Sequence, residues 1–376
     1  HCLREAGAGG SNPLTPTNKT KGLCAPAFEV QTKKTAQLAF LHAWIVCNAR
    51  PLARHLILGR PLVQASSGLH CSEKHHPVAF DAADRGGAAV SKLSAAQKAQ
   101  FDRDGVLLIE DAVTPEQLGA LRDVFATWVE ESRNHSDDYG ETLDGRARFD
   151  LQPGHSADTP GLRRVQSPEE VSDVFASVMR EAATVDFCAE LLGPSIRFHH
   201  GKVNSKLPGT ATEIKFHQDF PFQPMTNDDI VTCLLFIDDV TQENGPLEVV
   251  PGTHKGPLYS HWHNGVFTGA VADDVVDQYR GKIVPCTGPA GSVCLMHARL
   301  LHGSAPNLSS GPRTLYITTY YAEDAIELSP NHLPSTLTHE IVRGEASGRV
   351  RCTPYEMALP EVPKGTSFFA QQAASD

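Results

Sequence analysis

Two histidines and an aspartate in this 376-residue sequence have the types and spacing of metal ligands. His217 and Asp219 are separated by one residue, and residues i and i+2 of a strand point to the same face. His302 follows about 80 residues later, directly after two leucines. Two histidines and one carboxylate form the facial triad of non-haem Fe(II) enzymes, which leaves coordination positions open for other ligands. The sequence therefore predicts an iron site made of His217, Asp219 and His302.

The pattern H-x-D has low specificity by itself, because it arises by chance in many proteins and an isolated histidine is more often structural. His297, at the end of an expected strand, competes with His302 for the third ligand position. We favour His302 because Ser304 lies two residues beyond it and Arg313 lies eleven residues beyond it.

Arg313 and Ser304 also have the chemistry to bind a dicarboxylate. A hairpin between residues 302 and 313 would bring the Arg313 guanidinium back beside His302, where it would pair bidentately with a carboxylate. Ser304 would share the face of His302 and offer a hydroxyl to the same group. The sequence thus predicts an anion-binding position next to the iron site.

The elements that must position these residues are mostly strands. From residue 195 onward, short apolar or alternating runs separated by Gly, Pro and Asn are typical of a β-barrel or sandwich, as at 230–237, 247–250, 291–296 and 313–321. The preceding part predicts helices over 93–101, 115–132 and 168–192, a strand over 106–109 and a long polar loop over 133–166. We therefore expect helices that pack against a β-core.

Residues 93–324 resemble the phytanoyl-CoA dioxygenase family of Fe(II)- and 2-oxoglutarate-dependent oxygenases. Three motifs carry the resemblance: HQD at 217–219, NGPLEVVPGTHKG at 244–256, and HGSAPN-x-S-x-x-x-R at 302–313. The resemblance implies a mainly β fold with flanking helices, the double-stranded β-helix or jelly roll. It also implies hydroxylation of an unactivated C–H bond of a small organic substrate, with release of succinate and CO2. The implied cofactors are Fe(II), 2-oxoglutarate and O2, with ascorbate in a supporting role.

The same resemblance assigns roles to individual residues. The implied iron ligands are again His217, Asp219 and His302, and the implied co-substrate residues are Arg313, Ser304, Lys202, Arg164 and His261. Two departures from the family pattern concern the pocket wall: members often have an apolar residue at the position of Lys202 and a tryptophan within 233–235. Related halogenases have a small residue at the position of Asp219, so the carboxylate favours hydroxylation over halogenation.

Two other readings remain open from the sequence alone. One is a non-catalytic metal-binding jelly-roll protein, and the other is a cupin-like metal isomerase or hydrolase, which would leave Arg313 and Ser304 without a task. The substrate candidates are an acyl-CoA thioester, a small amino-acid-like solute and a secondary metabolite. We expect the loops 133–166 and 256–282 to select among them, and the second loop lacks a basic cluster for the phosphates of coenzyme A.

The charge distribution divides the chain. The formal net charge is −11, but residues 1–80 carry nine basic and three acidic side chains, so that all the excess negative charge lies beyond them. An acidic balance argues against a nucleic-acid partner. We expect a basic extension over 1–90, a dioxygenase domain over 91–350 and a tail over 351–376.

The cysteines and the apolar runs bear on location. Nine scattered cysteines without a C-x-x-C pair favour reduced thiols and an intracellular location. We expect the cytoplasm, unless the basic segment 1–80 is an organellar targeting sequence. The longest apolar run, 38–47, is too short for an integral membrane segment, which needs about 20 residues.

Overall fold

A computed structural model describes residues 92–209 and 213–361 of the chain. All of these residues fall within the second of two compact units, His75–Asp376. The expected extension 1–90 and the end of the expected tail lie outside the described residues. None of the helices in the described part of the chain has the length and apolar character that crossing a bilayer requires.

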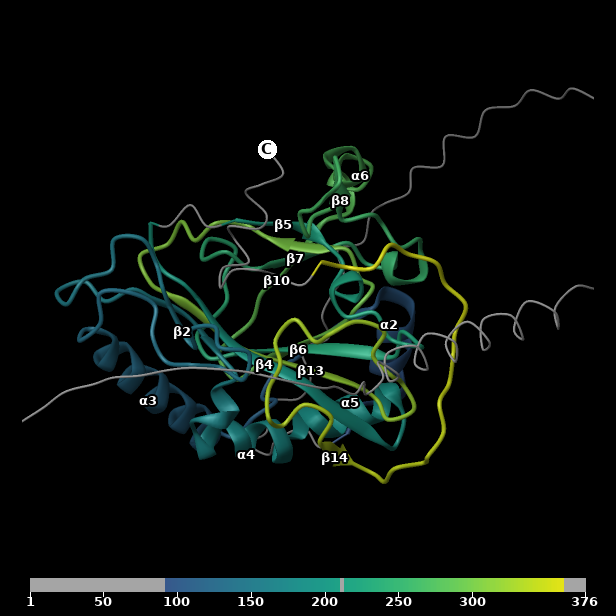
Figure 1. The fold of residues 1–376 in the computed structure, drawn as a ribbon, viewed down its shortest axis with the longest axis horizontal. Helices are drawn as coiled ribbons and strands as arrows, with labels where there is room; N and C mark the ends of the chain where they lie inside the picture. The colour runs from purple at the N-terminus through teal and green to yellow at the C-terminus, as the bar shows by residue number, and fades with distance from the viewer. Residues whose placement is uncertain (1–91, 210–212, 362–376) are drawn as a thin grey trace, which may run out of the picture. The chain divides into compact units, whose positions relative to one another are not determined.

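Two antiparallel sheets form the centre of the fold (Figure 1). The larger sheet has the order β1-β11-β6-β13-β4-β3-β2, with β14 also on β4, and the smaller sheet has the order β10-β7-β12-β5. The strands of the larger sheet are β1 (Val106–Ile109), β2 (Phe149–Leu151), β3 (Leu162–Gln166), β4 (Ile196–Lys206), β6 (Ile230–Phe236), β11 (Val293–His297), β13 (Arg313–Ala322) and β14 (Ile341–Arg343). Those of the smaller sheet are β5 (Ile214–His217), β7 (Leu247–Val249), β10 (Val284–Cys286) and β12 (His302–Ser304).

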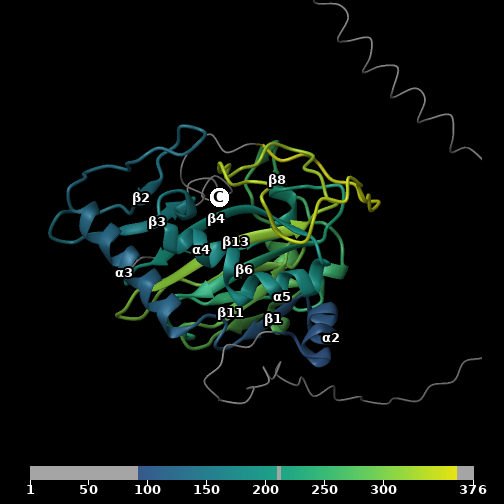
Figure 2. The ribbon, with the colours of Figure 1, turned by 90° about the horizontal axis from the view of Figure 1, so that it is seen from below.

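Helices cover one face of the larger sheet, as Figures 1 and 2 show for α3, α4 and α5. The α-helices are α2 (Ala95–Asp104), α3 (Pro115–Ser132), α4 (Asp173–Glu181), α5 (Ala183–Leu192) and α6 (Asp273–Asp277). Ser94 and Thr114 begin α2 and α3, each with a capping box closed by a glutamine three residues later. A short ribbon of β8 (Trp262–His263) and β9 (Val266–Phe267) precedes α6.

Strand β6 shows how the two layers of the core are formed. Cys233 and Leu235 belong to the apolar cluster that the helices cover, whereas Leu234 and Phe236 belong to the cluster between the two sheets. Every residue of β6 is buried, because both faces of the strand are covered. A strand of this kind reads as a continuous apolar run and not as an alternation.

The expected jelly-roll fold is confirmed, but three local expectations are wrong. The helix expected over 168–192 is interrupted at Ala182, whose extended backbone separates α4 from α5, and begins with a 3₁₀ turn over Pro168–Glu170. The polar loop expected over 133–166 contains β2 and β3, which extend the larger sheet beyond β4. Residues 302 and 313 do not form a hairpin, because β12 and β13 belong to different sheets and the chain between them crosses the sandwich.

Candidate metal centre

His217, Asp219 and His302 converge at one end of the sandwich. The two histidines are paired across β5 and β12, and their ring centroids lie 4.1 Å apart. Asp219 Oδ1 lies 3.6 Å from His217 Nε2 and 3.5 Å from His302 Nε2. These are the only three His, Cys, Asp or Glu side chains grouped closely enough to hold a metal ion within the described residues.

The local backbone sets the orientation of each ligand. His217 Nδ1 lies 2.8 Å from the Lys215 carbonyl oxygen, and His302 Nδ1 lies 2.9 Å from the Leu300 carbonyl oxygen. A carbonyl only accepts, so each Nδ1 carries the proton and each Nε2 presents its lone pair to the centre. Two imidazoles and a carboxylate directed at one point are the donor set expected for Fe(II).

Asp219 reaches the centre by a different route from the one expected. Strand β5 ends at His217, and Asp219 has helical backbone angles ahead of the 3₁₀ turn Phe220–Phe222. Its carboxylate is held by Thr232 of β6, whose hydroxyl donates to Oδ2 at 2.9 Å. Oδ1 is thereby left facing the two histidines.

Electrostatics keep His302 and Asp219 in their metal-binding forms. Burial lowers the pKa of His302 to about 4, with His217 as the next contribution, so the imidazole is neutral at pH 7. Burial raises the pKa of Asp219, but the opposing effect of His302, His217 and Lys202 is larger. The pKa of Asp219 therefore lies below its ordinary value. The carboxylate is therefore ionised at physiological pH.

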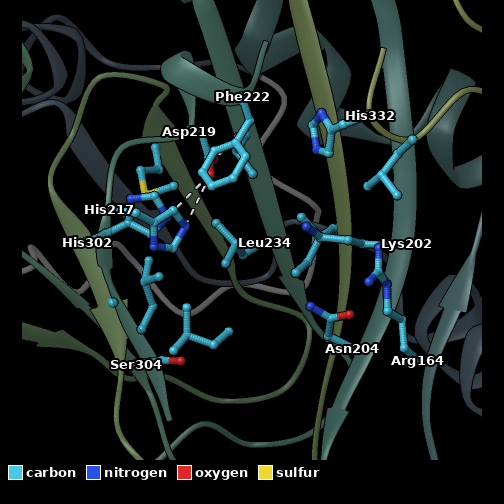
Figure 3. Close-up of a pocket in the computed structure, with 17 residues that line it drawn as sticks. Arg164, Lys202, Asn204, His217, Asp219, Phe222, Leu234, His302, Ser304 and His332 are labelled. Atoms are coloured by element: carbon cyan, nitrogen blue, oxygen red, sulfur yellow. Dashed lines mark hydrogen bonds and ion pairs between the residues drawn. The ribbon is translucent and has the colours of Figure 1, made fainter. Parts of the chain in front are cut away.

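A cavity of about 110 Å³ opens beside this centre. Its wall is largely apolar and includes Phe222, Leu234 and Ile317. Figure 3 shows His217 and His302 on one side of the cavity and Lys202, Arg164 and Asn204 on the opposite side, and His332 beyond Phe222 also lines the wall. The complete lining is Arg164, Lys202, Asn204, Ile214, His217, Asp219, Phe222, Thr232, Leu234, Leu247, Met296, His302, Gly303, Ser304, Ile317, His332 and Leu333.

A second cationic position lies behind Ser304. Lys206 Nζ donates to Ser304 Oγ at 2.8 Å and also to the Ala305 carbonyl, and Arg313 is paired with Lys206 across β4 and β13. Burial and the neighbouring Arg313 lower the pKa of Lys206 to about 7. Among the described residues the Arg313 Nε has no hydrogen-bond partner, although it is buried. Two adjacent cations with few counter-charges are a strong site for a carboxylate.

The structure brings most, but not all, of the predicted site residues to the cavity. The lining includes the three predicted metal ligands together with Ser304, Lys202 and Arg164. Arg313 is not in the lining, and it is the register partner of Lys206 across β4 and β13. His261 is buried outside the lining, where its Nε2 accepts from the Gln218 amide at 3.3 Å and its ring packs on Phe222.

Sequence reasoning missed four polar residues of this region: Lys206, Asn204, Thr232 and His332. Lys202, Asn204 and Lys206 alternate along β4, so a strand assignment to 196–206 would have grouped them on one face. Thr232 and His332 carry no such signal. The loop 256–282 contributes nothing to the lining within the described residues, and a segment around Leu333 takes that place.

A comparison with protein families decides the assignment. The model of the phytanoyl-CoA dioxygenase (PhyH) family matches residues 101–315, more than half of the chain and all of the cavity lining except His332 and Leu333. The chain belongs to the phytanoyl-CoA dioxygenase family. This is a family of Fe(II)- and 2-oxoglutarate-dependent dioxygenases, so the enzyme class expected from the sequence is confirmed.

Curated relatives in this family act on small molecules. A probable alpha-ketoglutarate-dependent hypophosphite dioxygenase from Stutzerimonas stutzeri is 38% identical over 184 residues, which cover 47% of this chain and 63% of that protein. The L-proline trans-4-hydroxylase of Streptomyces griseoviridis is 28% identical over 243 residues, which cover 59% of this chain and 84% of that enzyme. The alignment thus spans less than two thirds of the first relative and most of the second.

Solved structures share the fold. The crystal structure of EctD from S. alaskensis with 2-oxoglutarate and 5-hydroxyectoine aligns with a TM-score of 0.54 and 23% identity. The alignment covers 70% of this chain and 88% of that one. At this level of identity the likeness supports the jelly-roll architecture alone.

Proposed function

We propose that this chain is an Fe(II)- and 2-oxoglutarate-dependent dioxygenase that hydroxylates a small substrate and releases succinate and CO2. The observation that carries the proposal is the convergence of His217, Asp219 and His302 on one point beside a cavity. The two imidazole Nε2 atoms and Asp219 Oδ1 would hold the metal. Iron bound there supplies the oxidising chemistry together with 2-oxoglutarate and O2.

Lys206, Ser304 and Arg313 would anchor the co-substrate. Ser304 lies two residues from His302 on β12, so the separation of their Cα atoms is roughly 7 Å. That separation suits a five-carbon dicarboxylate with its keto acid end at the metal and its distal carboxylate near Ser304. Arg313 and Lys206 would then supply the positive charge that the distal carboxylate requires.

The apolar wall would hold the substrate and exclude water. Phe222, Leu234 and Ile317 contribute no hydrogen-bonding side chain, so they leave water little to bind next to the oxidised bond. Phe222 also packs edge-on against the ring of His217, with centroids 5.8 Å apart. The same side chain therefore shapes the cavity and supports a ligand.

The size of the cavity favours a small substrate. A space of about 110 Å³ that must also receive 2-oxoglutarate leaves little room for an acyl-CoA. Three of the curated relatives are named for hypophosphite, L-proline and ectoine. Each of these molecules is small and carries at least one charged group. We infer a substrate of similar size for this chain.

Substitution of the metal ligands tests the proposal. We expect Asp219→Ala and His302→Ala to lose tight Fe(II) binding and substrate-dependent succinate formation, because each removes a donor that the other two cannot replace. Fe(II) content after anaerobic loading and succinate release with ascorbate present are the two measurements.

His297→Ala provides the matched control. His297 is a histidine five residues from His302, at the end of β11, and it stacks near His254 instead of facing the metal position. We expect the folded variant to retain Fe(II) binding. Unchanged substrate-dependent succinate formation in Asp219→Ala would contradict the proposal.

A further inference from the structure

Lys202 is a half-buried cation that makes no ion pair among the described residues. Its side chain projects from β4 into the cavity toward the side that carries the metal ligands (Figure 3). Among the described residues no carboxylate lies within ion-pair distance of its ammonium group. Burial lowers the pKa of Lys202 to about 8, so it remains mostly charged at pH 7. An uncompensated buried charge is costly unless a ligand provides the opposite charge.

The co-substrate is badly placed to supply that charge. Lys202 and Lys206 are four residues apart on β4, which separates their Cα atoms by roughly 13 Å. Lys206 already contacts Ser304, the expected position of the distal carboxylate. 2-Oxoglutarate is about half as long as this separation. One molecule bound at the metal and at Ser304 therefore leaves Lys202 on the substrate side of the cavity.

Neutral polar groups beside Lys202 are also without partners. His332 Nδ1 is buried without a hydrogen-bond partner within the described residues, so it can donate to an anion when it carries the ring proton. Asn204 Oδ1 is also buried without a partner there, but as an amide oxygen it only accepts. Both residues line the cavity together with Lys202. Arg164 adds a guanidinium at this end, and the carboxylate of Asp150 on β2, its neighbour in the strand register, is ion-paired with Arg163 at 2.8 Å. Lys202 is thus a cation of this corner that makes no ion pair with a carboxylate among the described residues.

The lining that the structure describes provides no free acidic side chain that could bind a positively charged group of a substrate. Asp219 is the only acidic residue in the lining that the structure describes, and its carboxylate is directed at the two histidines. An ammonium or amidinium group of a zwitterionic substrate would therefore be buried without a partner. That arrangement selects against zwitterions as well as in favour of anions.

We propose that the substrate is a compact oxyanion without a cationic group, and that Lys202, with His332 beside it, binds its negatively charged oxygen atoms. This inference rests on the proposed dioxygenase function and specifies its substrate class. It also assigns Lys202 to the substrate, whereas the family resemblance places Lys202 at the co-substrate.

Titration calorimetry on the full-length, metal-free protein tests the site apart from turnover. Hypophosphite is the probe, and L-proline is the zwitterionic comparison. We expect one hypophosphite per chain and at least tenfold weaker binding in Lys202→Met, which removes the charge and keeps the length of the side chain. Lys202→Arg, which keeps the charge, should recover part of the loss.

Lys206→Met is the matched control, because it removes the same amino group from the same face of the same strand. We expect it to leave hypophosphite binding within about threefold and to weaken 2-oxoglutarate binding at least tenfold in the Fe(II)-loaded protein under anaerobic conditions. A Lys202→Met variant that loses affinity for 2-oxoglutarate but not for hypophosphite would overturn the assignment, as would equal binding of L-proline and hypophosphite.

The two proposals fail in different ways. If hypophosphite binds through Lys202 but no oxyanion supports succinate release, the anion site stands and the dioxygenase function falls. If succinate release is supported by L-proline or ectoine and is insensitive to Lys202→Met, the dioxygenase function stands and the oxyanion inference falls.

Discussion

Single hydrogen bonds decide the state of the residues at the metal centre. The carbonyls of Lys215 and Leu300 fix the tautomers of His217 and His302, and Thr232 directs one oxygen of Asp219. The ligand triad was predictable, because H-x-D and the segment after His302 are local patterns. Thr232 was not, because its contact depends on how β6 packs against the turn after β5.

The protonation of Lys202 predicts how anion binding depends on pH. Burial and Arg164 lower the pKa of Lys202 to about 8, whereas Asp219 raises it, and His332 and His200 are the other titratable groups facing it. Lys202 is charged below this pH and loses its proton above it. In the metal-free protein, hypophosphite binding should therefore be constant from pH 6 to 7 and decline about tenfold per pH unit above roughly pH 8.

Calorimetric titrations across this range would measure the effect, since hypophosphite itself remains a monoanion throughout. Lys202→Arg should abolish the decline, because a guanidinium keeps its proton in this range. A decline of the same size in Lys202→Arg would show that another group is responsible.

At the scale of elements, β12 has to lie close to β5 for its histidine to reach the metal. A methyl group on Gly303 would lie 2.9 Å from the Ile214 carbonyl oxygen and 2.9 Å from the ring of Phe216. Glycine at this position thus permits the close approach that pairs His302 with His217.

We expect Gly303→Ala to push β12 away from β5 and to weaken Fe(II) binding by at least tenfold, because the two histidines no longer meet at their present separation. Anaerobic Fe(II) titration measures this. Gly311→Ala is the control, since a methyl group there meets no atom within 4 Å. Equal Fe(II) affinity in both variants would argue against a steric role for Gly303.

The strands of the core were predictable where both faces are buried, as in β6, because such strands read as apolar runs. β2 and β3 were not, since they lie in a polar stretch and owe their structure to strand pairing, of β3 with β4 and of β2 with β3. The position of Arg164, which lies in β3, could therefore not be predicted from a strand assignment. The position of Arg313 was misjudged for a related reason: sequence distance suggested a hairpin, whereas strand pairing put it in the other sheet.

At the scale of the whole molecule, one buried carboxyl sets a pH dependence of stability. Glu169 belongs to the 3₁₀ turn Pro168–Glu170, and its side chain packs against β4, where Oε2 occupies the space that a side chain at position 201 would need. Both carboxyl oxygens are buried without a hydrogen-bond partner among the described residues. Burial raises the pKa of Glu169 from 4.5 to about 7.

A raised carboxyl pKa means that the folded state binds the proton more tightly than the unfolded state. The resulting stability is present below about pH 4.5 and is lost as the pH rises to about 7. Glu169→Gln stays neutral, so we expect its free energy of unfolding to exceed that of the unmodified protein at pH 8, by about 3 kcal/mol, and to differ little at pH 5.

Urea unfolding at the two pH values measures this difference. Glu170→Gln should behave in the opposite way, because Glu170 pairs with Arg148 at 2.6 Å and its pKa is lowered. That variant should lose more stability at pH 8 than at low pH. The same gain at both pH values in Glu169→Gln would rule out ionisation as the cause.

The three metal ligands also connect the two sheets of the fold. His217 and His302 belong to the smaller sheet, while Asp219 is tethered through Thr232 to β6 of the larger one. An ion held by all three residues would therefore link the two sheets of the sandwich. Separation of the two sheets would require release of the ion, so we expect bound metal to stabilise the folded protein as well as to supply its chemistry.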